Sequence, residues 1–332
     1  MTFVSPKAIL LIRNPVAGRR RRGFVEAVTD HVRAAGWTVD LVDTEAPGDA
    51  RHLAETCDAG RYGVIAVAGG DGTINEVVNG LARRGGEAPA LAIIPLGTAN
   101  VLAHELDLDF RAAAIARTIM SGQTLLVHPG EASCVAVDDA GVPHCFALMV
   151  GAGFDAKVVA GISAPFKRRF GRAAYVWRSL VEARRYRPVR YAVEIDGGEP
   201  CEAASVIVTR ARLYAGPYVV APQATLGEPL LHVCLFERWG RGQALRFGLA
   251  LLLGRLPQTG GYRVVTGRKV KISVLNDAGE TRVQPVQVDG DDMLTLPVSV
   301  ALVAGAVRLL QPSPSRLRQA LDNLGSRVAV GG

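Results

Sequence analysis

The chain has 332 residues, of which 49% are hydrophobic and 21% charged, a composition that excludes disordered, collagen-like and coiled-coil architectures. At about 150 residues per domain, this length predicts two domains with sizeable cores. Lys and Arg total 38 against 31 Asp and Glu, so the net charge is +7. This mild basic excess suits an anionic partner, whether a nucleotide, an anionic membrane surface or a nucleic acid.

The cysteines and the apolar runs indicate the compartment. Five cysteines without CxxC or Cys/His spacing argue against a disulfide framework or a zinc site, and favour a reducing, cytoplasmic compartment. Lys7 and Arg13 interrupt the N-terminal apolar stretch, so no secretory signal is predicted. The longest aliphatic run, residues 249–253, is far shorter than the ~20 residues of a membrane-spanning helix. We therefore expect a soluble or peripheral protein.

Strand-like and helix-like segments alternate through the first third of the chain. Apolar runs predict strands at residues 8–12, 37–42, 64–68 and 91–94. Helical periodicity predicts helices at residues 23–35, 50–59, 75–83 and 99–106. This order predicts an α/β domain over residues 1–124, in which helices cover both faces of a doubly wound parallel sheet.

The pattern changes after about residue 124, where short strands separated by turn signals follow one another. Strands are predicted at residues 189–195, 203–208, 230–236, 270–275, 283–288 and 298–303. Hairpin turns are predicted at 138–141 and 196–198, and helices at 165–187 and 243–252. We expect residues 125–305 to form an antiparallel β domain, a sandwich or an open barrel, and the tail 306–332 to pack back on the first domain.

A glycine-rich turn, Gly69-Gly70-Asp71-Gly72-Thr73, directly follows the third predicted strand. Glycines allow a tight turn and close approach to a ligand, and the amides that begin the next helix suit a phosphate. An aspartate in such a turn would repel this anion unless a divalent cation lies between them or the carboxylate acts as a base. The turn therefore predicts a phosphate site with Mg²⁺. The alternative is a plain strand–helix turn with Asp71 as the helix N-cap.

Two more motifs follow the first and fourth predicted strands. Residues 14–18 (NPVAG) precede four arginines, residues 19–22, which could bind phosphate or form only a solvated loop. Residues 95–100 (PLGTAN) offer Thr98 for a phosphate oxygen or a helix cap, and Asn100 for a similar role. Ligands of doubly wound sheets bind beyond the carboxyl ends of the strands, and all three motifs lie there.

Together these motifs resemble the diacylglycerol kinase catalytic-domain family, which includes bacterial diacylglycerol and lipid kinases, sphingosine kinases and ceramide kinases. The resemblance extends over nearly the whole chain. Residues 151–156 (GAGFDA) resemble the family's GxGxDA segment, residues 221–224 (APQA) its APxA segment, and residues 288–291 (VDGD) its DGE segment. The resemblance implies an N-terminal doubly wound sheet, like that of NAD kinases and diacylglycerol kinases, followed by an antiparallel β-sandwich.

The resemblance also implies that ATP and Mg²⁺ bind in the cleft between the domains. Asp71 would be the catalytic or metal-linked aspartate, and Asp289 and Asp291 would supply the partner acid, as a base or as Mg²⁺ ligands. The implied nucleotide-binding residues are Asn14, Gly18, Arg19, Gly69, Gly70, Gly72, Thr73, Glu76, Gly97, Thr98, Asn100, Asp155 and Arg168.

The chain departs from the family's pattern in two places. Asp291 replaces the glutamate of DGE, which keeps a carboxylate on a shorter side chain; alternatively, Asp289-Gly290 is merely a hairpin turn. The family's APxA segment continues with several acids, whereas residues 225–232 (TLGEPLLH) keep only Glu228. If those acids bind a structural Mg²⁺ in relatives, we expect that site to be lost here.

Residues 163–190 carry nine Lys and Arg against one acid, Glu182, with aromatic residues interleaved. This composition favours peripheral contact with an anionic membrane surface, at the cytoplasmic face of the inner membrane. The alternative is a solvated charged face over an aromatic core. No nucleic-acid reader motif accompanies the charge, so nucleic acid is not expected as a partner. A homodimer is compatible with this interpretation.

The leading hypothesis is an ATP-dependent lipid kinase that phosphorylates a lipid hydroxyl, with diacylglycerol, which yields phosphatidic acid, as the favoured acceptor. Asn75-Glu76 and the APxA segment favour it over an NAD kinase. The alternatives are a kinase of another alcohol, such as a sphingoid or ceramide lipid or NAD, and a nucleotide-binding regulator without catalysis. The missing acids near Glu228 favour the regulator, whereas the retained carboxylates argue against it.

Overall fold

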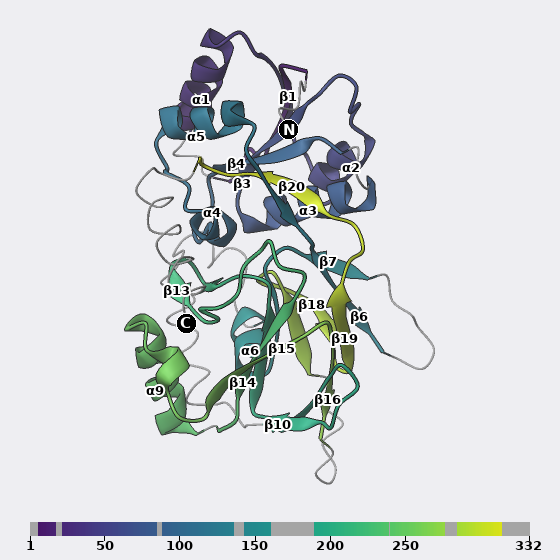
Figure 1. The fold of residues 1–332 in the computed structure, drawn as a ribbon, viewed down its shortest axis with the longest axis vertical. Coiled ribbons are helices and arrows are strands. Elements are labelled where there is room, and N and C mark those ends of the chain that lie inside the picture. The colour runs from purple at the N-terminus through teal and green to yellow at the C-terminus, as the bar shows by residue number, and fades with distance from the viewer. Residues whose placement is uncertain are drawn as a thin grey trace, which may run out of the picture.

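The structure, a computed structural model, describes residues 6–17, 22–84, 88–135, 143–160, 189–238, 240–275 and 284–313. Two domains are stacked along the long axis of the molecule (Figure 1). The first, at the top, combines strands and helices, and the second, below it, consists mainly of strands. Among the described residues, no helix is both long and apolar enough to cross a membrane.

The first domain is built on a six-stranded sheet with the order β2-β1-β3-β4-β20-β5. The strands are β1 (Ala8–Arg13), β2 (Thr38–Asp43), β3 (Val64–Gly69), β4 (Ala90–Pro95), β5 (Thr124–Val127) and β20 (Val307–Leu310). The helices are α1 (Arg22–Ala34), α2 (Asp49–Thr56), α3 (Asp71–Arg84), α4 (Val101–Glu105) and α5 (Ala112–Ser121). α1 packs against α5 and α2 against α3, which gives two helical layers with the sheet between them (Figure 1).

The two helical layers explain why the central strands are apolar. Because helices cover both faces, β3 and β4 are apolar runs in which every side chain is buried. α1 turns Val25, Val28 and Val32 toward the sheet, at the spacing of one helix face. β1 to β4 pair in parallel, so the predicted doubly wound sheet is confirmed.

The chain returns to this sheet near its end. β20 pairs in parallel with β4 at Leu309 and Leu91, and β5 pairs antiparallel with β20. The change from the first domain to the second therefore lies between β5 and β6, a few residues after the predicted boundary at residue 124. Of the predicted returning tail, residues 307–310 form β20, and residues 314–332 lie outside the described part of the chain.

Two six-stranded antiparallel sheets form the second domain, with the orders β10-β9-β16-β19-β6-β7 and β15-β14-β11-β8-β17-β18. The first sheet consists of β6 (Gly130–Cys134), β7 (His144–Phe146), β9 (Tyr191–Ile195), β10 (Cys201–Ala203), β16 (Lys269–Val274) and β19 (Val298–Leu302). The second consists of β8 (Met149–Ala152), β11 (Ser205–Thr209), β14 (Leu231–Phe236), β15 (Tyr262–Gly267), β17 (Pro285–Val288) and β18 (Asp291–Thr295). The smaller elements are α6 (Phe154–Ala160), β12 (Leu213–Tyr214), β13 (Tyr218–Val219), α9 (Arg241–Leu252) and a 3₁₀ turn, η2 (Leu256–Gln258).

Buried apolar and exposed polar residues alternate along the strands, and the apolar ones fill the interior of this sandwich. In β16, Val270 and Ile272 are fully buried between the sheets, whereas Lys269 and Lys271 are exposed. The sequence-based expectation of a sandwich or an open barrel is thus settled in favour of the sandwich. The predicted turn at 196–198 connects β9 to β10, and Asp196 and Gly197 both have positive φ.

Other details differ from the sequence-based expectation. The strand predicted at 203–208 is two strands, because the backbone leaves the first sheet after β10 and enters the second with β11. α5, β6, β7 and β8 were not predicted, since their short or small-residue sequences carry a weak periodic signal. The predicted helix at 165–187 and the predicted turn at 138–141 lie outside the described residues.

Candidate active site

The three motifs of the first domain meet beyond the carboxyl ends of β1, β3 and β4. Asn14, which follows β1, donates a hydrogen bond from Nδ2 to Oγ1 of Thr73 at 3.0 Å. Asn14 Oδ1 also accepts the amides of Val16 and Ala17, which holds its own turn closed. The loop after β1 and the glycine-rich turn after β3 are therefore joined by one asparagine.

Glycines are required where the two other turns touch. A Cβ on Gly97 would lie 2.7 Å from Cα of Gly70 and 2.8 Å from Oδ1 of Asn100. A Cβ on Gly69 would lie 2.7 Å from Cβ of Thr73. Real side chains do not approach so closely. Glycine at 97 therefore keeps the two turns in contact, and glycine at 69 leaves room for Thr73 of its own turn.

Asp71 is the first residue of α3 and faces the start of α4. Its carboxyl group lies near the backbone amides of Leu102, Val101 and Asn100. Burial raises the pKa of Asp71, and these amides oppose the rise. Oδ1 of Asp71 is buried, yet it has no hydrogen-bond partner among the described residues. A buried oxygen in this position is available to a ligand.

Asn100 supplies a second such oxygen from the turn after β4. Its backbone is left-handed, with φ at 47°, and its Nδ2 donates to the carbonyl of Gly97 at 2.9 Å. Asn100 is 4% exposed, and within the described part of the chain its Oδ1 has no hydrogen-bond partner. Two adjacent turns thus each present a buried, unpartnered oxygen.

The second domain contributes the turn between β17 and β18. Asp289 accepts the backbone amides of Ala147, Leu148 and Met149 at 2.7 to 3.0 Å, through both of its oxygens. Burial raises the pKa of Asp289 to about 7; the three amides oppose this, and the negative charge of Asp71 adds to it. This last influence places Asp289 near Asp71, across the junction of the two domains.

Asp291 begins β18 at the end of the same turn. A Cβ on Gly72 would lie 3.7 Å from Oδ2 of Asp291, so this carboxylate lies over the glycine-rich turn of the first domain. Asp291 is exposed to solvent. The structure therefore brings Asp71 and Asp291, which are predicted to act together, to opposite sides of one junction.

A buried hydrogen-bond network supports the turn between β17 and β18. Asp155 accepts hydrogen bonds from the hydroxyl of Tyr214 and from Nε2 of Gln287, the latter at 2.8 Å. Oε1 of Gln287 accepts the amide of Gly290 at 2.7 Å. Burial raises the pKa of Asp155, and its two donors oppose this. Asp155 was predicted to bind the nucleotide, but its two oxygens are engaged here with protein donors. Tyr214 and Gln287 carry no motif that sequence reasoning could have used.

Both domains have counterparts among known proteins. Residues 8–132 match the diacylglycerol kinase catalytic domain, and residues 148–311 match the YegS C-terminal NAD kinase beta sandwich-like domain. A Pseudomonas aeruginosa protein named "Probable lipid kinase YegS-like" is 31% identical over 234 residues, which are 69% of this chain and 72% of that protein. The chain belongs to the diacylglycerol kinase catalytic-domain family.

Two further relatives of this family member are instructive. A protein named diacylglycerol kinase from Bacillus subtilis (strain 168) is 26% identical over 273 residues, 81% of this chain and 86% of that protein. The crystal structure of a diacylglycerol kinase from Bacillus anthracis str. Sterne matches with a TM-score of 0.72 at 22% identity, covering 93% of this chain and 98% of that one. The structural match shows the shared fold, and membership of a kinase family supports phosphotransferase activity.

Kinase family membership implies ATP, usually with a divalent cation, and the site fits both. The unpartnered oxygens of Asp71 and Asn100 suit Mg²⁺ or a ligand donor, and the bare glycine turns leave backbone amides for phosphate. Within the described ranges, no three His, Cys, Asp or Glu side chains form a ready metal cluster. A cation held partly by nucleotide phosphates and water, which is the usual Mg²⁺ arrangement, is consistent with this.

The remaining predicted residues differ in placement. Thr98 is exposed in the turn before α4, and Glu76 is half-buried on α3. Gly18, Arg19 and Arg168 lie outside the described residues, so their predicted roles stay predictions.

Residues 226–230, whose single acid is Glu228, are held by an arginine. Arg210 is fully buried, and its guanidinium donates to the carbonyls of Leu226, Glu228 and Leu230. Burial lowers the pKa of Arg210 to about 10, which leaves it charged near neutral pH. A cation of the protein itself therefore sits among the carbonyls of residues 226–230. This contact was not predicted, because Arg210 has no motif around it.

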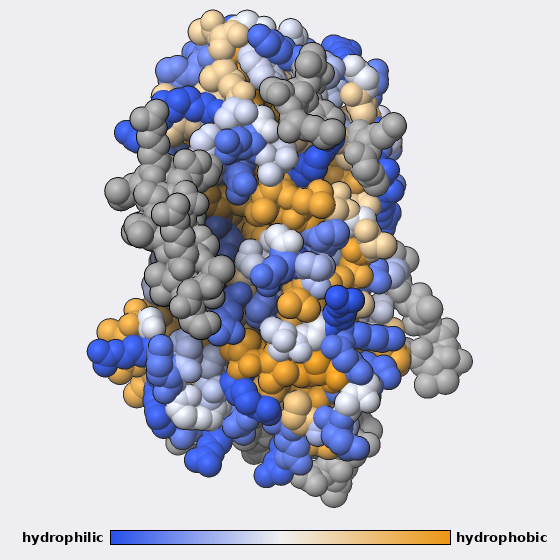
Figure 2. Space-filling model, viewed as in Figure 1, coloured by the Kyte–Doolittle hydropathy of each residue, from blue (hydrophilic) through white to orange (hydrophobic). Residues whose placement is uncertain are grey.

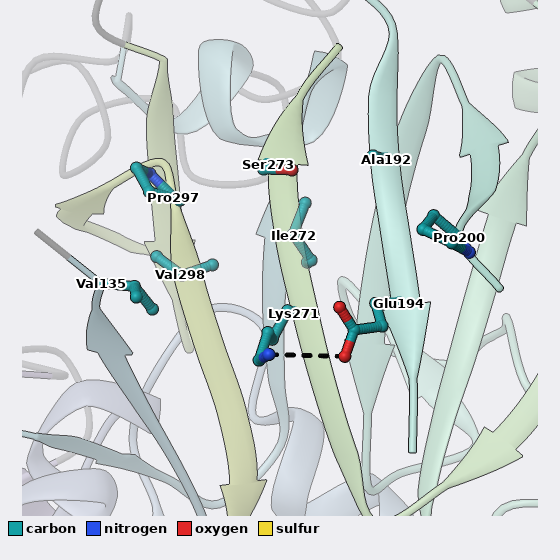
Figure 3. A pocket seen from close by; sticks show the side chains of 9 residues that line it. All are labelled: Val135, Ala192, Glu194, Pro200, Lys271, Ile272, Ser273, Pro297 and Val298. Carbon is teal, nitrogen blue, oxygen red and sulfur yellow. Dashed lines mark ion pairs between the residues drawn. The ribbon is translucent and has the colours of Figure 1, made fainter. Parts of the chain in front are cut away.

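A small pocket elsewhere shares no residue with this site. It lies on the outer face of the sheet that contains β9, β16 and β19, and the side chains of Lys271 and Glu194 form an ion pair of 3.4 Å within it (Figure 3). Its volume is about 130 Å³. Ligand pockets usually measure about 300–1,000 Å³, so this pocket does not account for a nucleotide or a lipid.

Proposed function

We propose that this chain is an ATP-dependent lipid kinase that transfers the γ-phosphoryl group of ATP to a lipid hydroxyl. Diacylglycerol, which would become phosphatidic acid, is the acceptor we favour. The observation that carries the proposal is the buried oxygen of Asp71, which has no hydrogen-bond partner among the residues that the structure describes. It lies where two glycine turns meet and faces the carboxyl groups of the second domain. Family membership gives the reaction class.

The first domain would bind the nucleotide. Phosphoryl transfer depends mainly on positioning and on neutralising phosphate charge. The turn amides from Gly69 to Thr73 begin α3 and can donate to phosphate oxygens. Asn14 keeps this turn aligned with the loop after β1. Mg²⁺ would neutralise phosphate charge, held by Asp291 together with phosphate oxygens and water.

Asp71 is the residue we assign as general base. Its raised pKa makes it a stronger proton acceptor than an exposed aspartate, and its Oδ1 has no donor among the described residues. Oδ1 would accept the proton of the acceptor hydroxyl as its oxygen attacks phosphorus. Asp289, in contrast, uses both oxygens for backbone amides, so we assign it the positioning of the turn that carries Asp291.

The acceptor would come from a bilayer, and we include contact with an anionic membrane surface in the proposal. The net charge of +7 supports such contact. The basic stretch at residues 163–190 is predicted to make this contact. It supports the proposal by its sequence alone, since residues 161–188 lie outside the described ranges.

The test is transfer of radiolabelled γ-phosphate from ATP, with Mg²⁺, into mixed micelles that carry diacylglycerol, monoacylglycerol, sphingosine or ceramide, with NAD as a soluble acceptor. Label in one lipid that is absent with Asp71→Asn supports the proposal and names the acceptor. Label in NAD alone indicates a nucleotide kinase. ATP binding without label in any acceptor indicates a regulator without catalysis.

A further inference from the structure

α9 presents a row of leucines to solvent. Leu245, Leu249, Leu252 and, just after the helix, Leu253 are 68%, 56%, 59% and 62% exposed. At roughly 100° per residue, these four side chains fall within about 100° of the helix circumference. Scattered exposed leucines are ordinary in soluble proteins, but a continuous apolar stripe on one helix face marks an interaction surface.

The opposite side of α9 anchors the helix to the sandwich. Phe247 is 4% exposed, and its ring packs edge-on against Phe236 of β14 at 5.2 Å between centroids. α9 lies at the margin of the second domain (Figure 1). Its four leucines are exposed, so they face solvent on the side away from Phe247. The lower left margin of Figure 2, where α9 lies, shows hydrophobic residues at the surface among hydrophilic ones.

Positive charge surrounds the stripe. Three exposed arginines carry this charge, one on α9 and one close to each of its ends in sequence. Arg246 directly follows Leu245, and Arg255 lies two residues beyond Leu253. Both arginines are exposed. Arg238, also exposed, lies beside Gly261 in the loop before β15. An apolar face bordered by arginines is typical of helices that lie in a membrane interface.

The stripe is also connected to the candidate active site. α9 contacts β13, which pairs with β12, and β12 contacts α4, whose first amides face Asp71. Tyr214 of β12 also binds Asp155 in the network behind the catalytic turn. These elements follow one another down one side of the molecule (Figure 1). A partner surface that binds α9 would therefore lie on the same side of the molecule as β12 and α4, the elements that connect α9 to the candidate active site.

We infer that the leucine stripe of α9, with Arg238, Arg246 and Arg255, docks on the surface of an anionic phospholipid bilayer. The inference rests on the proposed function, because a lipid kinase takes its acceptor from a bilayer. The leucines would enter the boundary between headgroups and acyl chains while the arginines meet anionic headgroups. A second copy of the chain is a poorer occupant, since it would bring two strongly basic faces together.

The test is flotation of the full chain with vesicles of phosphatidylcholine and phosphatidylglycerol, or of phosphatidylcholine alone. The double variant Leu249→Glu/Leu253→Glu should lower partitioning onto the anionic vesicles by about tenfold or more. The matched control is Leu126→Glu on β5, a leucine 52% exposed, which should float as the wild type does. Arg246→Gln/Arg255→Gln should lose about fivefold for each charge on the anionic vesicles alone, and added salt should have the same effect.

The outcomes separate this inference from the kinase proposal, because flotation needs no catalysis. Wild-type protein that does not float, or a leucine variant that floats like the wild type, overturns the docking surface. A leucine variant that changes from dimer to monomer in light scattering, with unchanged flotation, makes α9 an interface between copies and also overturns it. If the leucine variant alone loses flotation while the wild type labels no lipid, the docking surface stands and the kinase proposal fails.

Discussion

Asp289 lies close enough to Asp71 for the charge of one carboxylate to raise the pKa of the other. Asp71 begins α3 in the first domain, whereas Asp289 follows β17 in the second. Each domain therefore contributes one desolvated carboxyl group to their junction, and burial is the main cause of the raised pKa of both. Two such groups resist being ionised together unless a cation is present. Because a cation would allow both groups to be ionised, binding of Mg²⁺ at the junction should favour the close approach of the two domains.

Asp71→Asn is expected to lower kcat for lipid phosphorylation by at least about a hundredfold, because the amide cannot accept the hydroxyl proton. The fold should persist, since asparagine keeps an oxygen for the amides that begin α4 and removes a desolvated charge. Single-turnover transfer and the midpoint of thermal unfolding measure the two effects. Turnover at the wild-type rate would remove Asp71 from the chemistry.

The pKa of Asp289, raised to about 7, predicts a pH dependence of stability. An unfolded aspartate loses its proton near 3.9, so between about pH 4 and 7 the folded protein binds more protons than the unfolded chain. The contribution of Asp289 to the free energy of unfolding is therefore fully present below about pH 4 and is lost as the pH rises through 7.

Urea unfolding at several pH values, with wild type and Asp289→Asn, tests this sign. The variant loses its best acceptor for the amides of Ala147, Leu148 and Met149, so it should be less stable at low pH. The difference between the two proteins should shrink as the pH rises to 7. Asp30→Asn, on the exposed side of α1, is the control and should leave the slope unchanged. A difference that grows with pH would contradict the assignment.

The first domain was predictable from sequence because its signals are local. β3 and β4 are uninterrupted apolar runs, and each is followed by a glycine turn, so the order of strands and helices can be read directly. The motifs alone predict Asp71, Thr73 and Asn100 at the same sheet edge, because each follows the carboxyl end of a parallel strand. The return of β20 was harder to place, because pairing with β4 joins residues far apart in the chain.

The support of the site was not predictable in the same way. Asp289 was expected to be a base or a metal ligand, whereas both of its oxygens hold the backbone after β7. Asp155 is likewise engaged by Tyr214 and Gln287, which lie on other elements of the second domain. Such contacts depend on how the sheets pack, and residue type and spacing do not encode them locally.

Gly97→Ala is expected to weaken ATP binding and to destabilise the fold. The new Cβ would lie 2.7 Å from Cα of Gly70 and 2.8 Å from Oδ1 of Asn100, so the two turns must separate. Overpacking of this kind costs about 1–3 kcal/mol. Gly23→Ala in α1 is the matched control: its Cβ has nothing within 4 Å, and alanine favours a helix by about 0.5–1 kcal/mol. Calorimetric ATP titration and thermal unfolding measure both; an unchanged affinity for ATP would separate this contact from the nucleotide site.

Arg210→Met is expected to lower the free energy of unfolding by about 3 kcal/mol or more, because three buried carbonyls lose their donor. The control is Arg190→Met, since its ion pair with Glu202 joins side chains 66% and 61% exposed and should contribute about 1 kcal/mol or less. In the Asp291→Asn background, which removes a proposed Mg²⁺ ligand of the active site, unfolding should be the same with EDTA and with Mg²⁺, because the guanidinium supplies the positive charge among these carbonyls. If Mg²⁺ stabilises Arg210→Met but not the wild type, a cation can replace the arginine. If EDTA destabilises Asp291→Asn as much as the wild type, residues 226–230 require a metal despite Arg210.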